Sequence, residues 1–332
     1  EPTGRKVAVI GAGPAGLACS LALAAAGEAV TLYDRSPQPG GVMRYGIPSY
    51  RLPREVLDQE IAWILSAGVQ FVPNTEVGRD VDMADLVRQY DAVFIGAGLG
   101  EPESPSIPGA DVPGVISAYS FLRAAGEPDE NTRQQALGEV IAQPLGQVVV
   151  LGGGNVAVDA ACTALRMGAE SVAVAYRRTR AEMPAWAEEV ELAEEEGVKL
   201  VFLLSPAEVL QAEGKVQGVR MTRMKLAEDD ASGRPRPVPS GEPDDTIAAD
   251  TVVLAFGQAP NESIFSSLPS LARSESGMIA VDADTAATSV AGVFAGGDAV
   301  NGGTTVVQAV SEGLRAAERI RACLDSVTPA RD

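Results

Sequence analysis

"VVVLGGGNVAVDA" at residues 148–160 and "VAVIGAGPAGLA" at residues 7–18 share one pattern. In each, an apolar stretch typical of a buried strand ends in a glycine-rich turn, and a helical segment follows. Glycine lets the backbone approach a pyrophosphate closely, and the free N–H groups at the start of the helix bind the anion. One such turn holds one dinucleotide, so two copies predict two dinucleotide-binding sites in an α/β chain.

The residues after the second strand of each unit distinguish the two sites. Asp34 follows a predicted strand over residues 29–33, where an acidic side chain accepts hydrogen bonds from the hydroxyls of an adenosine ribose. Arg177 and Arg178 follow the corresponding strand over residues 171–176, and arginine there favours a 2′-phosphate through charge-assisted contacts. The second site is therefore predicted to prefer NADP(H) to NAD(H). The alternative interpretation is a solvated basic turn.

Composition limits the classes of function. The 332 residues, 46% apolar and 21% charged, are typical of two packed domains. A net charge of −19 opposes non-specific binding to nucleic acid or an anionic membrane. The sequence has no histidine, which removes mechanisms that need an imidazole base. The N-terminal apolar stretch imitates a secretory signal, but its glycines and Pro14 fit the dinucleotide turn, and we expect no membrane span.

The three cysteines occur singly within helical patterns. Cys19, Cys162 and Cys323 form no Cys-x-x-Cys pair, so we expect each to be a small core residue. This pattern favours a reducing compartment and a cytoplasmic protein. It predicts no metal site, iron–sulfur cluster or redox disulfide within the chain.

Further elements follow from periodicity and turn residues. A helix is expected to begin near Pro53, with a core face of Leu57, Ile61, Ile64 and Leu65. The polar segment between Leu226 and Thr246 predicts a mobile hairpin tip.

The final helix is expected to have Thr304 or Thr305 as its N-cap. Its predicted inward face comprises Val307, Val310, Leu314 and Ala317.

Several longer motifs resemble one known family. In chain order they are "GAGPAG", "GGVMRYGIPSYRLP", "GGGNVAVD", "YRRTRAEMP", "LAFGQAPN" and "AGGDAVNGGTTVVQAV". Together they resemble the NAD(P)H-oxidising FAD module of the glutamate synthase small subunit, which dihydropyrimidine dehydrogenase and the NADH-dependent ferredoxin:NADP oxidoreductase share. The resemblance covers nearly the whole chain.

The resemblance implies two Rossmann-like domains, with the NAD(P)H domain inserted in the FAD domain. It implies an FAD-binding domain over residues 1–117 and 283–332 and an NAD(P)H-binding domain over residues 118–282. By motif match, FAD contacts are implied at Gly11, Gly13, Pro14, Ala15, Gly16, Asp34, Gly41, Arg51, Ala97, Gly98, Gly297, Asp298, Thr305, Val306 and Val307. NADP(H) contacts are implied at Gly152, Gly154, Asn155, Val156, Arg177, Arg178 and Gly257.

The implied reaction is hydride transfer from NADPH to FAD, in which no side chain has to move a proton. The expected acceptor of the electrons is an iron–sulfur protein or domain. The relatives carry an N-terminal cysteine-rich iron–sulfur domain that this sequence lacks, and the sequence leaves open whether that domain was removed or is naturally absent. Two alternatives remain: a stand-alone reductase of ferredoxin, quinone or another small acceptor, and a non-catalytic flavin-binding subunit.

Overall fold

A computed structural model describes residues 2–100, 102, 106–127, 129–141, 145–229 and 233–326. The chain divides into two compact units. The first comprises Glu1–Arg44, Ser49–Glu101 and Gln258–Asp332, and the second comprises Tyr45–Pro48 and Pro102–Gly257.

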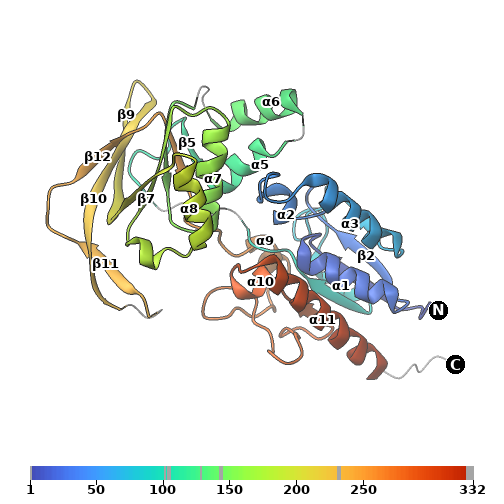
Figure 1. Ribbon diagram of the computed structural model, residues 1–332. Helices are drawn as coiled ribbons and strands as arrows, with labels where there is room; N and C mark the ends of the chain where they lie inside the picture. Colours follow the sequence, from blue (N-terminus) through green and yellow to red (C-terminus); the bar gives the residue numbers. More distant parts are fainter. Residues whose placement is uncertain are drawn as a thin grey trace. The chain divides into compact units, whose positions relative to one another are not determined.

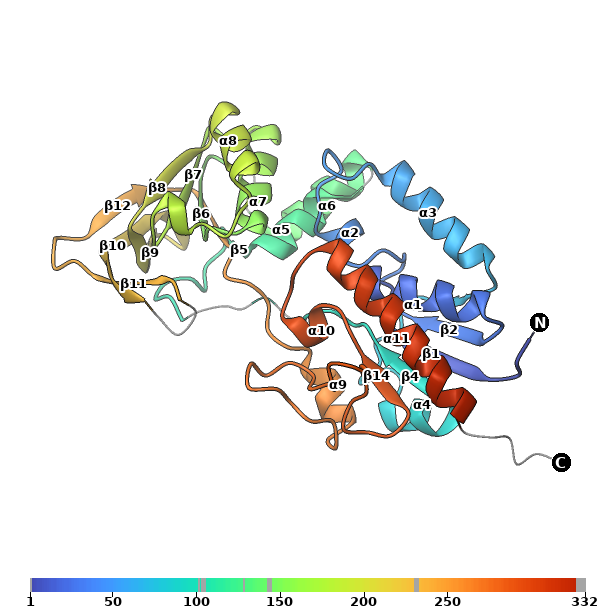
Figure 2. The same ribbon diagram turned by 60° about the horizontal axis from the view of Figure 1, so that its bottom comes forward.

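The first unit is built on a parallel five-stranded sheet in the order β14-β4-β1-β2-β3, of which Figure 2 labels β14, β4, β1 and β2. Its elements are β1 (Lys6–Ile10), α1 (Pro14–Ala25), β2 (Ala29–Tyr33), α2 (Val42–Tyr45), α3 (Arg54–Ser66), β3 (Gln70–Val72), α4 (Met83–Gln89), β4 (Ala92–Ile95), α9 (Glu262–Ser267), β14 (Val293–Ala295), α10 (Asp298–Asn301) and α11 (Val306–Ser326). The order in which strands are added to the sheet reverses at β1: β2 and β3 extend the sheet on one side, and β4 and β14 extend it on the other. In sheets of this kind ligands bind at the carboxyl ends of the strands at that switch point.

Helix α11 packs beside α1, and both views show the two helices side by side (Figures 1 and 2). The predicted inward face of α11 is partly wrong, because Val307 is 78% exposed and Leu314 is 43% exposed. The buried face instead carries small residues, including Ala309 and Gly313. A Cβ on Gly313 would overlap the carbonyl oxygen of Ala15, so close approach of the two helices selects small side chains at this face.

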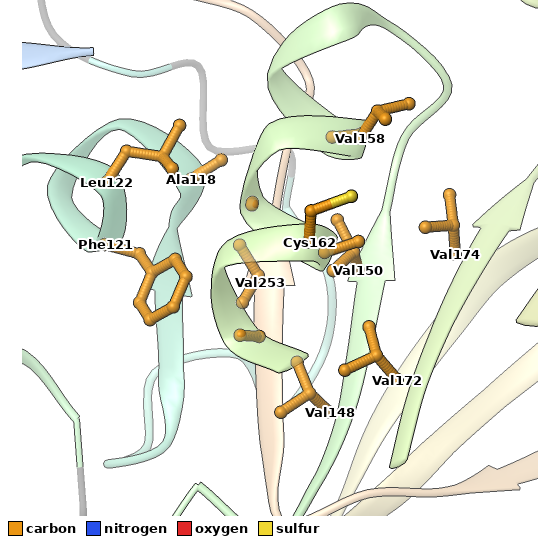
Figure 3. Packing of buried hydrophobic residues seen from close by; sticks show 14 of the residues in the cluster. Ala118, Phe121, Leu122, Val148, Val150, Val158, Cys162, Val172, Val174 and Val253 are labelled. Atoms are coloured by element: carbon orange, nitrogen blue, oxygen red, sulfur yellow. The ribbon is translucent and has the colours of Figure 1, made fainter. Parts of the chain in front are cut away.

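The second unit contains another parallel five-stranded sheet, in the order β5-β13-β6-β7-β8. Its elements are β5 (Val115–Ser117), α5 (Ala118–Ala125), α6 (Glu130–Val140), β6 (Gln147–Leu151), α7 (Asn155–Arg166), β7 (Ser171–Tyr176), a 3-10 turn η1 (Arg180–Glu182), α8 (Ala187–Glu195), β8 (Lys199–Phe202), β9 (Leu204–Ala212), β10 (Lys215–Asp229), β11 (Pro235–Pro239), β12 (Asp245–Ala248) and β13 (Thr251–Leu254). Valines of β6 and β7 pack against α7 around Cys162, and Phe121 of α5 belongs to the same cluster (Figure 3). This core supports the turn between β6 and α7.

A four-stranded antiparallel sheet completes the second unit. Strand β10 pairs with β9, β11 and β12. The predicted hairpin is confirmed by the pairing of β10 with β11, whereas residues 230–232 at its tip lie outside the described part of the chain.

The boundaries of the units differ from the predicted domain limits. Strand β5 was expected in the first domain, but it pairs with β13, and the main segment of the second unit therefore begins at Pro102. The chain returns to the first unit at Gln258 rather than at residue 283, because α9 packs in the core of that unit through Ile264 and Phe265. The predicted fold class is confirmed: two Rossmann-like units, with the second inserted in the first.

Candidate functional site: two glycine-rich turns

The first glycine-rich turn joins β1 to α1 at the carboxyl edge of the first sheet. Gly11 donates its N–H to the Tyr33 carbonyl oxygen at 2.8 Å and so continues the pairing of β1 with β2. A Cβ on Gly11 would lie 2.7 Å from the Cα of Ala97, and a Cβ on Gly16 would overlap the Gly11 carbonyl oxygen. Backbone packing alone therefore requires glycine at both positions.

The Asp34 carboxylate reaches this turn from the end of β2. Its Oδ2 accepts a hydrogen bond from the Ala12 N–H at 2.6 Å, and its Oδ1 accepts one from the Ser36 N–H at 2.7 Å. Each carboxylate oxygen has two lone pairs, so the group keeps acceptor capacity for ribose hydroxyls. The structure thus brings the Asp34 carboxylate to the glycine-rich turn.

Other glycines surround the start of α1, which begins with Pro14. A Cβ on Gly41 would lie 2.7 Å from the Cα of Gly13, and one on Gly297 would lie 2.9 Å from the Cβ of Ala15. Gly13 differs, because its φ is −78° and the nearest atom to an added Cβ is the Gly41 Cα at 4.0 Å. Packing within the protein therefore leaves room for a side chain at Gly13.

The Gly-Gly-Asp turn that follows β14 leads into α10. Asp298 accepts a hydrogen bond from the Thr304 N–H at 3.4 Å. Burial raises the pKa of the Asp298 carboxyl, the Thr304 hydrogen bond lowers it, and the nearby Glu312 raises it, with a net upward shift. Sequence reasoning missed Glu312, which is buried on α11. The sequence signal that could have revealed it is the spacing of Ala309, Glu312 and Ala316, which places all three residues on one face of the helix.

The N-terminus of α11 is capped as predicted by Thr305, whose Oγ1 accepts a hydrogen bond from the Gln308 N–H at 3.1 Å. Val306 and Val307 are the first residues of the helix. Their N–H groups belong to the first turn of α11, where backbone donors have no partner within the helix.

The remaining predicted residues of the first unit follow β4 or precede α3. Ala97 and Gly98 follow β4, which pairs with β1, so they lie at the same sheet edge as Gly11. Gly98 has φ +66° and no atom within 4 Å of an added Cβ. Arg51 lies in the loop before α3, with its guanidinium carbon 6.0 Å from the centroid of the Tyr50 ring.

The second glycine-rich turn joins β6 to α7. Gly152 donates to the Ala175 carbonyl oxygen at 3.1 Å, and a Cβ on Gly152 would overlap the carbonyl oxygen of Ala255. Gly154 has φ −90°, and the nearest atom to an added Cβ is Cγ of Pro184 at 3.9 Å. In both turns the first glycine is required by packing, whereas the glycine two residues later, Gly13 or Gly154, leaves room for an added Cβ.

The segment after β7 is hydrogen-bonded to the second turn. The Ala185 N–H donates to the Gly153 carbonyl oxygen at 3.2 Å, and the Trp186 N–H donates to Asn155 Oδ1 at 2.9 Å. The Tyr176 hydroxyl donates to the Glu182 carbonyl oxygen at 2.8 Å. The Asn155 side chain therefore holds protein backbone, a structural role that the sequence did not reveal.

Val156 and Gly257 complete the predicted residues of the second unit. Val156 is the second residue of α7 and is 48% exposed. Gly257 follows β13, which pairs with β6, so it lies at the same edge of the sheet as Gly152. Its φ is +106°, and no atom lies within 4 Å of an added Cβ.

The two predicted phosphate-binding arginines have different surroundings. Arg177 is exposed and, among the described residues, makes no ion pair. It follows β7, the neighbour of β6, and so lies at the same sheet edge as Gly152. Arg178 is only 3% exposed, and its Nε donates to the Pro235 carbonyl oxygen at 2.8 Å. Arg177 thus has the exposure that a phosphate contact needs, and Arg178 holds β11.

The cysteines are free, and two of them match the prediction. Cys19 and Cys162 are buried, whereas Cys323 is exposed on α11 and is no core residue. Burial raises the pKa of the Cys19 thiol, which opposes formation of a reactive thiolate. The described ranges contain no group of three or more cysteine or acidic residues able to hold a metal ion. Across the same residues, no helix is long and apolar enough to span a lipid bilayer.

Comparison with known proteins places these turns in a family context. The family model described as pyridine nucleotide-disulphide oxidoreductase matches residues 5–313. The beta subunit of NADP(+)-dependent formate dehydrogenase from Moorella thermoacetica is 47% identical over 96% of this chain, which spans 44% of that subunit. The small chain of glutamate synthase [NADPH] from Escherichia coli is 40% identical over 96% of this chain, which spans 69% of that protein.

A similar fold occurs in solved structures. Mycobacterium tuberculosis FprA, solved in complex with NADPH, aligns over 98% of this chain and 85% of its own with a TM-score of 0.81 at 20% identity. That likeness supports the fold, with two Rossmann-like units in one chain. The family match confirms FAD and NADP(H) as the cofactors of this NAD(P)H-dependent oxidoreductase. The chain belongs to the pyridine nucleotide-disulphide oxidoreductase family, in the group of FAD- and NADPH-dependent oxidoreductase modules that includes the small chain of glutamate synthase.

Proposed function

We propose that this chain binds FAD at the first glycine-rich turn and NADPH at the second, and that it passes electrons from NADPH through FAD to an iron–sulfur protein or domain. FAD supplies the hydride-accepting chemistry when bound. The protein binds and orients the two cofactors, so no acid–base side chain is required.

One contrast between the turns supports this assignment of cofactors. Asp34 faces the first turn, where its negative charge suits ribose hydroxyls and opposes a 2′-phosphate. The exposed Arg177 lies beside the second turn and has the charge and donors that a 2′-phosphate needs. The first turn therefore suits FAD and the second suits NADPH.

The proposed partner rests on the curated relatives. The chain spans 44% of the length of the formate dehydrogenase subunit that it resembles, so that protein contains further sequence outside the shared module. Both named relatives are subunits, which implies that they work with other chains. We infer that this chain passes electrons to an iron–sulfur protein or domain, as its resemblance to the glutamate synthase small subunit implies.

The partner is tested by an acceptor comparison with purified, flavin-loaded chain and NADPH. Faster steady-state reduction of an iron–sulfur ferredoxin than of a soluble quinone at equal concentration supports the proposal. Turnover with the quinone alone would identify a stand-alone reductase of small acceptors instead.

Replacing Arg177 by alanine should weaken NADPH selectively. Loss of a charged contact to the 2′-phosphate at this exposed position should lower kcat/KM for NADPH about 5- to 30-fold, which is about 1 to 2 kcal/mol of transition-state stabilisation, and leave kcat/KM for NADH nearly unchanged. The measurement is anaerobic flavin reduction with each nucleotide.

Two further arginine variants serve as controls. Arg180→Ala removes a nearby exposed arginine whose Nη1 pairs with Glu194 at 2.6 Å, and it should leave both nucleotides unaffected. Arg178→Ala should loosen the contact with β11 and lower thermal stability, because the residue is buried. Equal losses for NADPH and NADH in Arg177→Ala would show that Arg177 does not read the phosphate.

A further inference from the structure

A buried carboxylate lies behind the Gly-Gly-Asp turn. Glu312 on α11 is 8% exposed. Its Oε2 accepts a hydrogen bond from the Gly297 N–H at 2.6 Å, and its Oε1 accepts one from Gln308 Nε2 at 2.7 Å. Asn301 Nδ2 donates to both oxygens, at 3.1 and 3.2 Å. One side chain therefore joins the turn, the end of α10 and the first part of α11.

The groups that contact the Glu312 carboxylate are hydrogen-bond donors. The Gly297 N–H can only donate. The Asn301 amide is fixed in orientation, because its Oδ1 accepts a hydrogen bond from the Gly303 N–H at 2.9 Å. A carboxylate only accepts hydrogen bonds. The Gly297 N–H and the Asn301 amide are two donors of fixed orientation that face the carboxylate oxygens of Glu312.

The charge of Glu312 is buried without a cation. No lysine or arginine in the described part of the chain pairs with it. A buried charge that is held only by neutral donors keeps a desolvation penalty, and a bridge between segments does not by itself require that penalty. The charge lies behind a turn proposed to contact FAD, where it acts electrostatically on the bound flavin.

We propose that Glu312 is a positioning residue of the flavin site that also lowers the reduction potential of the bound flavin. The inference rests on the proposed binding of FAD to the first unit. Reduction adds negative charge to the flavin, and a fixed negative charge in a low-dielectric interior opposes that addition. The N-terminus of α11 has the opposite effect, because its dipole favours negative charge. Glu312 and the helix end together set the potential at which electrons leave for a low-potential acceptor such as an iron–sulfur centre.

Glu312→Gln separates the charge from the bridge. The Gln308 amide can rotate so that its oxygen accepts from the new amide, while the remaining oxygen still accepts from the Gly297 N–H. FAD should therefore remain bound. We expect the equilibrium constant for two-electron reduction of the flavin to rise about tenfold, which is about 30 mV. The measurement is an anaerobic spectroscopic titration against a redox dye of known potential.

Two controls make the test specific. Glu318→Gln removes the same charge from an exposed position on the same helix and should leave the potential unchanged. Glu312→Asp keeps the charge and should stay closer to the wild-type potential than Glu312→Gln. If Glu312→Gln yields no folded protein, Glu312→Ala removes both the charge and the bridge, and its potential is measured in the fraction of protein that retains FAD.

The outcomes distinguish this inference from the proposed function. An unchanged potential in a flavin-loaded variant without the charge would overturn the role of Glu312. An equal rise in Glu312→Asp would also overturn it, because the charge would then not be the cause. A wild-type protein that binds no FAD would contradict the proposed function itself.

Discussion

Gly16→Ala should yield no stable, flavin-loaded protein. An added Cβ would overlap the Gly11 carbonyl oxygen and would also lie 3.3 Å from Cγ1 of Val9. Because the overlap is with backbone, the start of α1 or the end of β1 must move. We expect the free energy of unfolding to fall by about 3 kcal/mol or more. Thermal unfolding and the flavin content of the purified variant provide the measurement.

Gly138→Ala is the matched control for this substitution. Gly138 lies within α6, and no atom lies within 4 Å of an added Cβ. Alanine in a helix interior is favoured over glycine, so this variant should be as stable as the wild type or slightly more stable. A Gly16→Ala protein with wild-type stability and full flavin content would show that the packing around the first turn is not as described.

Gly13→Ala should lose FAD while the protein keeps its fold. The backbone at Gly13 is extended and an added Cβ meets nothing closer than 4.0 Å, so alanine fits the protein itself. The same Cβ would occupy space that we assign to the FAD pyrophosphate. We expect the dissociation constant for FAD to rise about 10- to 100-fold, or roughly 1.4 to 2.7 kcal/mol. Fluorescence titration of the apoprotein with FAD measures it.

Gly154→Ala gives the crossed comparison. Its added Cβ would have its nearest neighbour at 3.9 Å, so alanine again fits the protein. This variant should weaken NADPH by a similar factor and leave FAD binding unchanged, whereas Gly13→Ala should weaken FAD more than NADPH. If each substitution weakened the other cofactor instead, the assignment of FAD and NADPH to the two turns would be reversed.

The parts of the site that the sequence predicts are those determined over short distances. Gly11 and Gly16 lie within one turn, and the collisions that exclude a side chain there involve backbone close in sequence or in the neighbouring strand. Asp34 and Arg177 follow strands adjacent to the turns, so their places at the sheet edge follow from strand order. Parallel βαβ units make this relation regular.

Contacts between distant segments escaped prediction. Glu312 gains its role only because α11 brings it to the Gly297 N–H. The inward face of α11 was misjudged because periodicity selects large apolar residues such as Leu314, whereas close packing against α1 selects small ones such as Gly313. Adjacent arginines look alike in sequence, whereas in the structure Arg178 is buried and donates to β11 and Arg177 is exposed.

The domain limits depended on pairing that no local pattern reveals. Strand β5 contains only Val115–Ser117, and it belongs to the second sheet because β13, far along the chain, pairs with it. A short strand beside a predicted linker carries too little periodicity to be assigned from sequence.

Anaerobic addition of NADPH to the flavin-loaded chain tests the central claim most directly. If the chain binds both cofactors and transfers hydride between them, an excess of NADPH should decrease the visible absorbance band of oxidised flavin. NADH at the same concentration should do so more slowly, and Gly154→Ala with bound FAD should require more NADPH. A flavin-loaded wild-type protein whose visible absorbance NADPH leaves unchanged would contradict the account and identify a flavin-binding subunit without turnover.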